Sequence, residues 1–129
     1  MSNGHPLIRM SERRRVETPE PSDPVEDYLR DVERVPPLTS AEERELWDAF
    51  KGGDESGDAY KRLMEANLRL IAPIAVRYEG RGLPLGDLVQ EANLGLLRAV
   101  EKFDPSEGGD FATFANRRIE DAIVGVLPD

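Results

Sequence analysis

The side chains best suited to binding chemistry lie on one side of a helix expected between Leu83 and Asp104. At about 100° per residue, that side gathers carboxylates, an amide, an arginine and two leucines. Its members are Asp87, Gln90, Glu91, Leu94, Leu97, Arg98 and Glu101. Because a solvated surface does not need two large leucines among polar groups, the mixture favours a partner-binding surface. An ordinary wet face with isolated exposed leucines is the alternative.

Catalytic and metal-binding chemistry has little support in the sequence. There is no cysteine and the only histidine is His5, so a nucleophile with a base, or a metal-ligand cluster, cannot be assembled from the usual residues. The glycines at 79–82 lack the spacing of a phosphate-binding loop and predict a helix stop. Residues 104–110 lack the ligand spacing of a calcium loop and predict a turn. We therefore expect a protein that is not an enzyme and holds no metal or cofactor.

Composition limits the partners of the chain. A length of 129 residues with 39% apolar content suits one domain. The formal net charge of −9 argues against tight autonomous binding to nucleic acid, because such binding relies on Lys and Arg. The lack of cysteine is compatible with a reducing cytoplasm. No apolar run has the length of a secretory or membrane segment, so we expect a soluble, cytoplasmic protein without membrane contact.

Helical periodicity predicts an all-α fold, a compact domain of about four or five helices. The side of the central helix opposite the polar face forms an apolar stripe. It consists of Leu88, Val89, Ala92, Leu96, Ala99, Val100 and Phe103. A final helix is expected over 111–126, with its own apolar stripe. That stripe comprises Phe111, Phe114, Ala115, Ile119, Ala122 and Ile123.

Three upstream helices complete the expected domain. The first opens at Asp23 with Pro24 in its first turn, and the prolines at 36–37 end it. The second opens with a Thr39–Glu42 capping box, turns Leu46, Ala49 and Phe50 inward, and stops at the glycines 52–53. The third is expected over 59–78, paired with the first and bent at Pro73. Residues 1–22 show no apolar periodicity and are expected to form a disordered tail.

The run DLVQEANLGLL from Asp87 to Leu97, followed by AVEKFDP from Ala99 to Pro105, resembles the core-polymerase-binding segment of the sigma-70 family of bacterial sigma factors. Residues 23–53 resemble the family segment that precedes it. The resemblance implies docking of this helix on the coiled coil of the β′ clamp of core RNA polymerase. The polymerase contacts that it implies, with the neighbouring outward leucine, are Asp87, Gln90, Glu91, Asn93, Leu94 and Leu97.

The resemblance is weaker where the family reads promoter DNA. Phe111 and Phe114 match aromatic positions of the minus-ten-reading helix, although both can equally belong to the core. Arg117 and Arg118 replace a tandem tryptophan and can bind phosphate or stack on a base. Carboxylates stand at 120 and 121, where the family has a basic residue and a base-reading amide. Residues 111–129 hold two arginines against three carboxylates, so this candidate DNA surface lacks a positive charge.

The resemblance divides the expected domain at 23–129 into three segments. These are 23–53 (upstream helices), 54–104 (polymerase-binding helices) and 105–129 (a degraded promoter-reading helix).

Two functions follow from the resemblance. The first function is a sigma-factor-like role in transcription initiation, with DNA contacted only as part of the polymerase complex. The second is a non-initiating regulator or decoy that binds polymerase or an anti-sigma factor. Since the sequence ends at Asp129, we expect the family's downstream promoter-binding domains to be absent.

Overall fold

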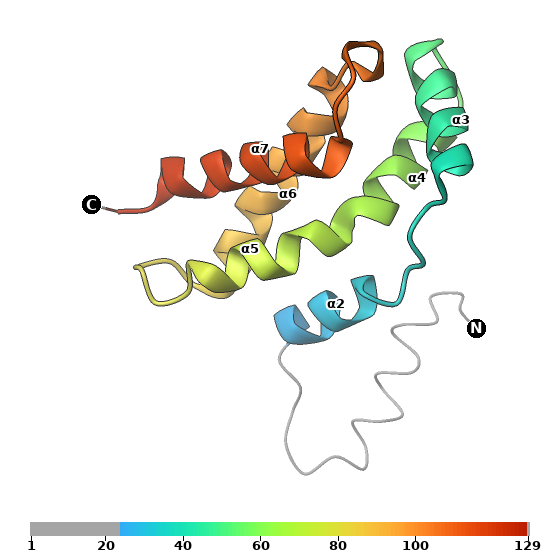
Figure 1. Cartoon of the computed structure of the whole chain (residues 1–129). Coiled ribbons are helices and arrows are strands. Elements are labelled where there is room, and N and C mark those ends of the chain that lie inside the picture. Colours follow the sequence, from blue (N-terminus) through green and yellow to red (C-terminus); the bar gives the residue numbers. More distant parts are fainter. Residues whose placement is uncertain (1–23, 129) are drawn as a thin grey trace, which may run out of the picture.

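The computed structural model describes residues 24–128, and this part of the chain contains helices and no strands (Figure 1). The elements are α2 (Pro24–Val32), α3 (Ser40–Lys51), α4 (Asp58–Asn67), the 3₁₀ turn η1 (Leu68–Leu70), α5 (Ile71–Arg77), α6 (Leu85–Lys102), η2 (Pro105–Glu107) and α7 (Phe111–Val126). If α4, η1 and α5 are counted as one rod, the described residues form five helices, which confirms the predicted all-α class. The expected tail at 1–22 and the Asp23 cap lie outside the described residues.

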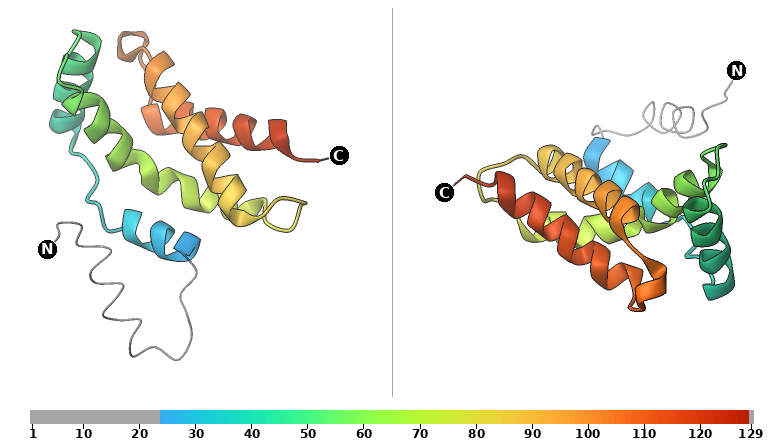
Figure 2. Two further views of the ribbon diagram at one scale, coloured as in Figure 1. Left: turned by 180° about the vertical axis from the view of Figure 1, so that it is seen from behind. Right: turned by 90° about the horizontal axis from the view of Figure 1, so that it is seen from above.

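The centre of the fold is α6, which packs against α7, α5 and α4 (Figure 2). Every residue of its predicted apolar stripe is buried, which confirms the periodicity argument. The stripe of α7 is also largely buried, with Ile119 and Ile123 fully inaccessible to solvent. The core therefore lies where α6 meets its three neighbours, and α6 keeps one side free of them.

Gly95 sets the distance between α6 and α7. A Cβ atom placed on it would lie 2.8 Å from the Cα of Ile119 and 2.9 Å from the carbonyl oxygen of Arg118. Both distances are far below a normal van der Waals contact, so only glycine permits this approach of the two backbones. Because the backbones of α6 and α7 lie this close together, α6 fixes the position of α7 and of the side chains that α7 presents to solvent.

The rod formed by α4 and α5 changes its helical type just before Pro73. Proline has no backbone N–H, and its ring conflicts with the carbonyl group four residues earlier, which is that of Arg69. The α-helix accordingly gives way to η1 over 68–70 and then resumes. Figure 1 shows that the rod continues in the same general direction, as a bend would give, although its α-helical hydrogen bonding is interrupted.

The expected pairing of this rod with the first helix is only partly correct. The α4 part packs against α3 and α6, whereas α2 contacts the rod mainly at η1. The reason is the length of α2, which ends at Val32, before the prolines at 36–37. A helix of nine residues is too short to follow a rod of twenty, and the chain from 33 to 39 carries α3 away to the far end of α4.

An aromatic cluster joins α3 to the ends of α6 and α7. Trp47 is only 3% exposed, and its ring centroid lies 5.1 Å from that of Phe103 and 5.2 Å from that of Phe111. Of the predicted inner positions of α3, Leu46 and Phe50 pack against the core, whereas Ala49 is exposed. The buried residue that the prediction left out is Trp47. The large indole ring of Trp47 fills the space beside Phe103 and Phe111, which an alanine side chain could not fill.

The predicted turns are present. Gly80 and Gly82 adopt positive φ angles of 82° and 110° in the segment between α5 and α6, as a helix stop requires. The carboxylate of Asp104 accepts hydrogen bonds from the backbone N–H and the hydroxyl of Ser106, and these bonds lower its pKa. Asp110 caps α7 by accepting from the N–H of Thr113. Two of the carboxylates in the 104–110 segment are thus used to shape the turn.

Replacing Thr39 by alanine is expected to lower the free energy of unfolding by about 1 kcal/mol at neutral pH. Thr39 accepts from the N–H of Glu42 at 3.1 Å, and Glu42 accepts from the N–H of Thr39 at 2.9 Å, so the predicted capping box is confirmed. The neighbouring Ser40→Ala variant is the control, and urea unfolding followed by circular dichroism measures both. An equal loss in both variants would contradict the capping assignment.

The contribution of Glu42 to this cap should depend on pH. The backbone hydrogen bond at Thr39 lowers the pKa of Glu42 in the folded protein. A lowered folded-state pKa gives stability that is present above the unfolded pKa and lost as the pH falls through the folded value. The variant that tests this is Glu42→Ala, and its difference in free energy of unfolding from wild type should shrink as the pH falls below the ordinary pKa range of a glutamate carboxyl.

Candidate functional site

The outer face of α6 carries the six predicted polymerase contacts Asp87, Gln90, Glu91, Asn93, Leu94 and Leu97. Three of them (Asp87, Gln90 and Leu94) are exposed, and the other three are half-buried. Leu94 is 43% exposed, which is unusual for a leucine in the middle of a helix whose other side forms the core. Five of the six lie on the outward side that the periodicity predicted, and Asn93, which only the resemblance supplied, lies at its border beside the cleft between α2 and α6.

The polar groups of this face have no partners within the described residues. None of the four polar side chains forms a hydrogen bond or an ion pair with any other residue between 24 and 128. Two carboxylates and two amides are therefore available to a partner, with Leu94 and Leu97 between them. Such a surface offers hydrogen-bond acceptors and donors around an apolar centre, which is the usual arrangement of a specific protein interface.

The predicted DNA contacts of α7 are not equally placed. Phe111 is 3% exposed and packs between Trp47 and Phe103, so its ring has no face open to a base. We therefore remove Phe111 from the candidate DNA contacts and assign it to the core, the alternative that the sequence left open. The physical reason is its position at the first residue of α7, where the chain returns to the aromatic cluster.

Three other predicted DNA contacts lie where a single strand of DNA could reach them, namely Phe114, Arg117 and Arg118. Arg117 and Arg118 are exposed, and Phe114 is half-buried with its ring 5.3 Å from that of Phe103. The guanidinium carbon of Arg118 lies 4.7 Å above the Phe114 ring centroid, a cation–π contact. This pair presents a flat, positively charged platform, and such platforms stack bases in single-stranded nucleic acid sites.

The carboxylate of Glu120 is bound by Arg77, the last residue of α5, and by Tyr78, which follows it. The hydroxyl of Tyr78 donates to Oε2 at 2.6 Å, and a guanidinium nitrogen of Arg77 donates to the same oxygen at 3.2 Å. The hydrogen bond to Glu120 is the main cause that raises the pKa of Tyr78. Part of the negative charge that the sequence placed on the DNA-reading side is thus offset by Arg77, whereas Asp121 stays exposed.

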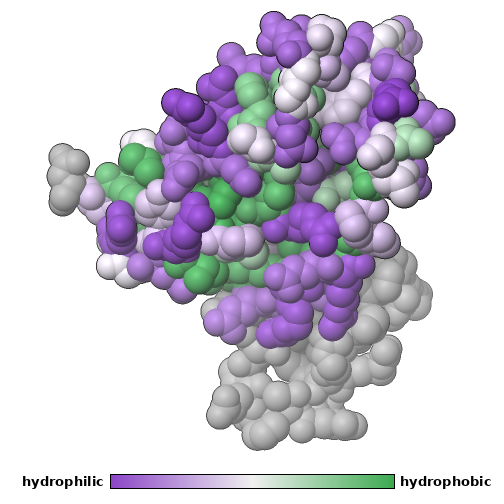
Figure 3. Space-filling view, in the orientation of Figure 1, coloured by the Kyte–Doolittle hydropathy of each residue, from purple (hydrophilic) through white to green (hydrophobic). Residues whose placement is uncertain are grey.

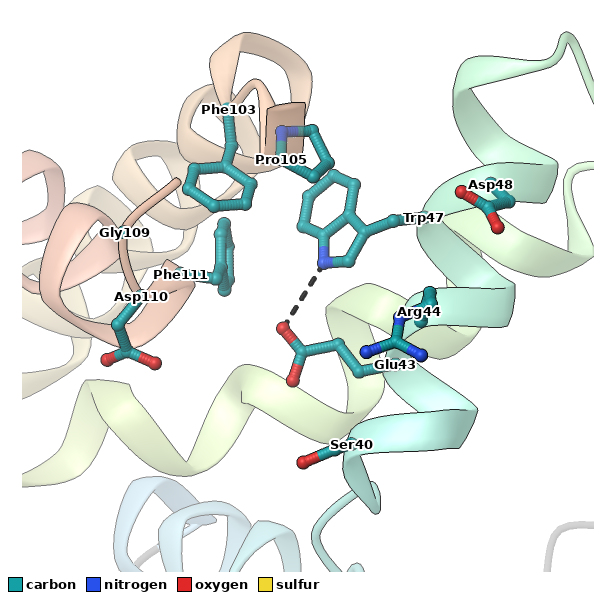
Figure 4. Close-up of a pocket in the computed structure, with 10 residues that line it drawn as sticks. All are labelled: Ser40, Glu43, Arg44, Trp47, Asp48, Phe103, Pro105, Gly109, Asp110 and Phe111. Atoms are coloured by element: carbon teal, nitrogen blue, oxygen red, sulfur yellow. Dashed lines mark hydrogen bonds between the residues drawn. The ribbon is translucent and has the colours of Figure 1, made fainter. Parts of the chain in front are cut away.

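Three of the clefts on the described surface lie between pairs of helices. The first, of about 300 Å³, lies between α3 and the start of α7 (Figure 4), where Glu43 accepts a hydrogen bond from the indole N–H of Trp47 at 3.3 Å. Its charged lining groups are Glu43, Arg44, Asp48 and Asp110, so it is negative overall. The second, also of about 300 Å³, lies between α2 and α6 and has no charged lining group. The third separates α5 from α7.

Residues 24–128 hold neither a metal-ligand cluster nor a membrane-spanning helix. No cluster of three or more histidine, cysteine, aspartate or glutamate side chains in this range is arranged to hold a metal ion. No helix in the same range combines the length and the apolar character that crossing a membrane requires.

Sequence reasoning missed three features of the site. Gly95 was part of a matched motif, but nothing local reveals that it lies against the backbone of α7. The tie from Tyr78 to Glu120 joins residues 42 positions apart. Arg69 lines the third cleft and had no role assigned. The Pro73 signal could have directed attention to the last of these, because the 3₁₀ turn that it causes contains Arg69.

Comparison with known proteins agrees with this architecture. The chain matches the Sigma-70 factor, region 1.2 family over residues 23–56 and the Sigma-70 region 2 family over residues 63–125. Together these matches cover well over half of the chain and define an all-α domain of the sigma-factor class. The chain belongs to the sigma-70 family.

Two relatives show how far the similarity extends. The RNA polymerase sigma factor SigA of Bacillus sp is 48% identical over 108 residues, which is 84% of this chain and 28% of that protein. The protein of the same name from Clostridium acetobutylicum is 50% identical over 107 residues, 83% of this chain and again 28% of the relative. The chain thus spans a little over a quarter of the length of these relatives.

Proposed function

We propose that the chain acts in transcription initiation by docking on core RNA polymerase at the coiled coil of the β′ clamp. The observation that carries this proposal is the outer face of α6, whose polar side chains have no partners within residues 24–128. Its sequence is also the part that resembles the polymerase-binding segment of sigma factors most closely. A helix held on three sides by the core presents these groups without further ordering, which lowers the cost of association.

We further propose that α7 contacts single-stranded minus-ten DNA inside the polymerase complex, through Phe114, Arg117 and Arg118. The stacking of Arg118 on Phe114 supports this role, because the pair combines a ring face with a positive charge. The acidic balance of the whole chain explains why the contact would require the polymerase. Docking first would supply the binding energy that α7 alone lacks.

A second function remains in competition because of Asp121, an exposed carboxylate on the candidate DNA helix. A negative charge beside a phosphate backbone lowers affinity, so a chain with this residue could occupy polymerase, or bind an anti-sigma factor, without capturing promoter DNA. The deciding experiment mixes the full chain with core RNA polymerase and tests the complex for capture of a pre-melted promoter fragment. Docking with capture supports initiation. Docking without capture supports the regulator, and no docking points to an anti-sigma protein as the partner.

Replacing Asp121 by glutamine is expected to increase promoter-fragment affinity of the complex about threefold at low salt, since one exposed repulsive charge is removed. Asp121 is the better choice over Glu120, whose carboxylate ties α7 to Tyr78 and Arg77. Glu65→Gln, on the exposed side of α4, is the control for charge alone. Equal gains from both variants would show that only net charge matters and that α7 does not face DNA.

A further inference from the structure

The outer face of α6 has the residue spacing of a coiled coil. Its central line of side chains follows steps of three, four, three and four residues, the heptad spacing that keeps one line facing a second helix. We call this line the outer seam, and its members are Asp87, Gln90, Leu94, Leu97 and Glu101. The two leucines lie at its centre and the polar groups at its ends. A second helix therefore fits along this face.

No element within residues 24–128 covers the outer seam. In the view from behind in Figure 2, α6 crosses in front of α7, and no other helix lies in front of α6. Figure 3 looks onto the opposite side, in the orientation of Figure 1, where α5 and α7 lie in front of α6. That side shows apolar surface between hydrophilic side chains, and a helix bound along the outer seam leaves it uncovered.

Two opposite charges flank the leucines of the outer seam. Glu91 and Arg98 lie one heptad apart on the same flank of α6, and neither forms a hydrogen bond or an ion pair through its side chain with any residue between 24 and 128. At 1.5 Å per residue they lie about 10 Å apart along the helix. Each is therefore available to a charged group on another helix.

Antiparallel pairing of two copies of α6 brings complementary groups together. In a pair related by a two-fold axis, a residue i that contacts residue j of the second copy is matched by residue j contacting its residue i. With the leucines as central layers, Leu94 faces Leu97 of the second copy, and Leu97 faces its Leu94. The same register places Glu91 opposite Arg98 of the second copy, and Arg98 opposite its Glu91. The pair thus combines two leucine layers with two ion pairs.

The polar ends of the outer seam favour the same orientation. In the antiparallel register, Gln90 faces Glu101 of the second copy, so its amide can donate to that carboxylate. Asp87 lies at the edge of this pair, because the position opposite to it comes after the end of α6 at Lys102. A parallel pair would instead place Asp87 and Glu101 each opposite its own copy, where like charges repel. The charge pattern therefore selects the antiparallel pair.

We propose that a second copy of this chain covers the outer face of α6, through an antiparallel two-fold pair of α6 helices. One helix from each copy makes a small interface, so we expect a weak dimer with a dissociation constant of about 10–100 μM. The pairing itself goes beyond the proposed function and does not depend on it. Its consequence does rest on that function. The dimer covers Gln90, Glu91, Leu94 and Leu97, so self-association and polymerase docking exclude one another.

The first test is sedimentation equilibrium of the full chain from about 5 to 500 μM, a range that spans the expected dissociation constant. The apparent mass should rise with concentration from 14.4 kDa towards that of a dimer. A chain that stays monomeric over the whole range overturns the proposal and leaves the outer face to polymerase or to an anti-sigma factor.

Reversal of the flanking charges tests the register of the pair. Glu91→Arg and Arg98→Glu should each weaken the dimer about tenfold, because each places like charges opposite one another twice. The combined variant restores two opposite-charge pairs and should dimerise like the wild type. Since the single variants change the net charge in opposite directions, net charge alone cannot weaken both. Lack of recovery in the combined variant, with its helical circular dichroism unchanged, overturns the register.

Glu45→Arg is the matched control for the charge reversals, because it reverses an exposed carboxylate on α3, outside α6. It should dimerise like the wild type. A tenfold loss in this variant as well would show that the dimer does not form through the outer face of α6.

The orientation can be tested by cross-linking, because the chain has no cysteine of its own. One preparation carries Leu94→Cys, and a second preparation, with a tag that changes its mass, carries Leu97→Cys. Under mild oxidation the mixture should yield the mixed disulfide-linked dimer in several-fold excess over the dimers of either variant with itself. Preferential linkage of each variant to itself would indicate a parallel pair and overturn the proposed arrangement.

Competition with core RNA polymerase separates this inference from the proposed function. If both hold, polymerase should dissociate the dimer, and the mixed disulfide-linked dimer should bind polymerase only after reduction. Binding of the linked dimer without reduction would show that the pair does not cover the docking surface. A dimer that passes the sedimentation and cross-linking tests, in a chain that does not dock, refutes the proposed function alone. Docking by a chain that never self-associates refutes the pairing alone.

Discussion

Replacing Gly95 by alanine is expected to lower the free energy of unfolding by about 1–3 kcal/mol, although alanine is the better helix former. The added Cβ would lie 2.8 Å from the Cα of Ile119 and 3.1 Å from the Cβ of Ala122. The atoms it meets are backbone or the first atom of a side chain, so no rotamer change can relieve the contact. Helix α7 must move away from α6, and the buried contacts of Ile119 and Ile123 loosen with it.

Gly125→Ala is the matched control for this prediction. Gly125 is also helical, in the last turn of α7, but nothing lies within 4 Å of a Cβ placed on it. The same substitution should therefore be neutral or should stabilise the protein by up to about 1 kcal/mol. Urea unfolding of the two variants, followed by circular dichroism, gives both values. Changes of the same sign would mean that intrinsic helix propensity outweighs the close approach of α6 and α7.

The same displacement has a functional consequence. Arg118 contributes the carbonyl oxygen that the new Cβ would meet, and its guanidinium covers the Phe114 ring. If α7 contacts DNA, Gly95→Ala should reduce promoter-fragment capture at temperatures where the variant is still folded. The outer face of α6 is unchanged by the substitution, so polymerase docking should persist.

Local periodicity predicted those parts of the fold that depend on one helix at a time. In α6, apolar residues recur with the helical period over 18 residues, so the buried stripe and the outer face could be assigned without any knowledge of the neighbours. In α3 the method failed at Trp47. That helix has 12 residues and few apolar ones, and the position of its buried side was decided by Phe103 and Phe111 in distant segments.

Charge was harder to interpret from sequence than apolarity. Glu120 was read as a group that repels DNA, because the sequence shows its charge but not the Tyr78 hydroxyl and the Arg77 guanidinium that bind it. Nothing in the sequence indicated that Arg69 lines a cleft, because that cleft forms only where α5 approaches α7. Tertiary contacts decide whether a charged side chain is paired, and no spacing rule within one helix reports them.

The largest functional effect is expected from Asp87→Ala combined with Gln90→Ala. If the outer face of α6 docks on core RNA polymerase, the double variant loses a carboxylate and an amide from the contact, and affinity should fall at least about tenfold. Both side chains are exposed and have no partner among residues 24–128, so the fold should be unaffected and the helical circular dichroism signal should be unchanged. Competition binding to core polymerase measures the change.

Glu45→Ala is the control for this experiment, because it removes an exposed carboxylate from α3, away from α6. It should bind polymerase like the wild type. Wild-type affinity of the double variant for polymerase would remove the outer face of α6 from the interface. Loss of polymerase binding in the double variant, with wild-type binding by Glu45→Ala, would support the outer face of α6 as the docking surface.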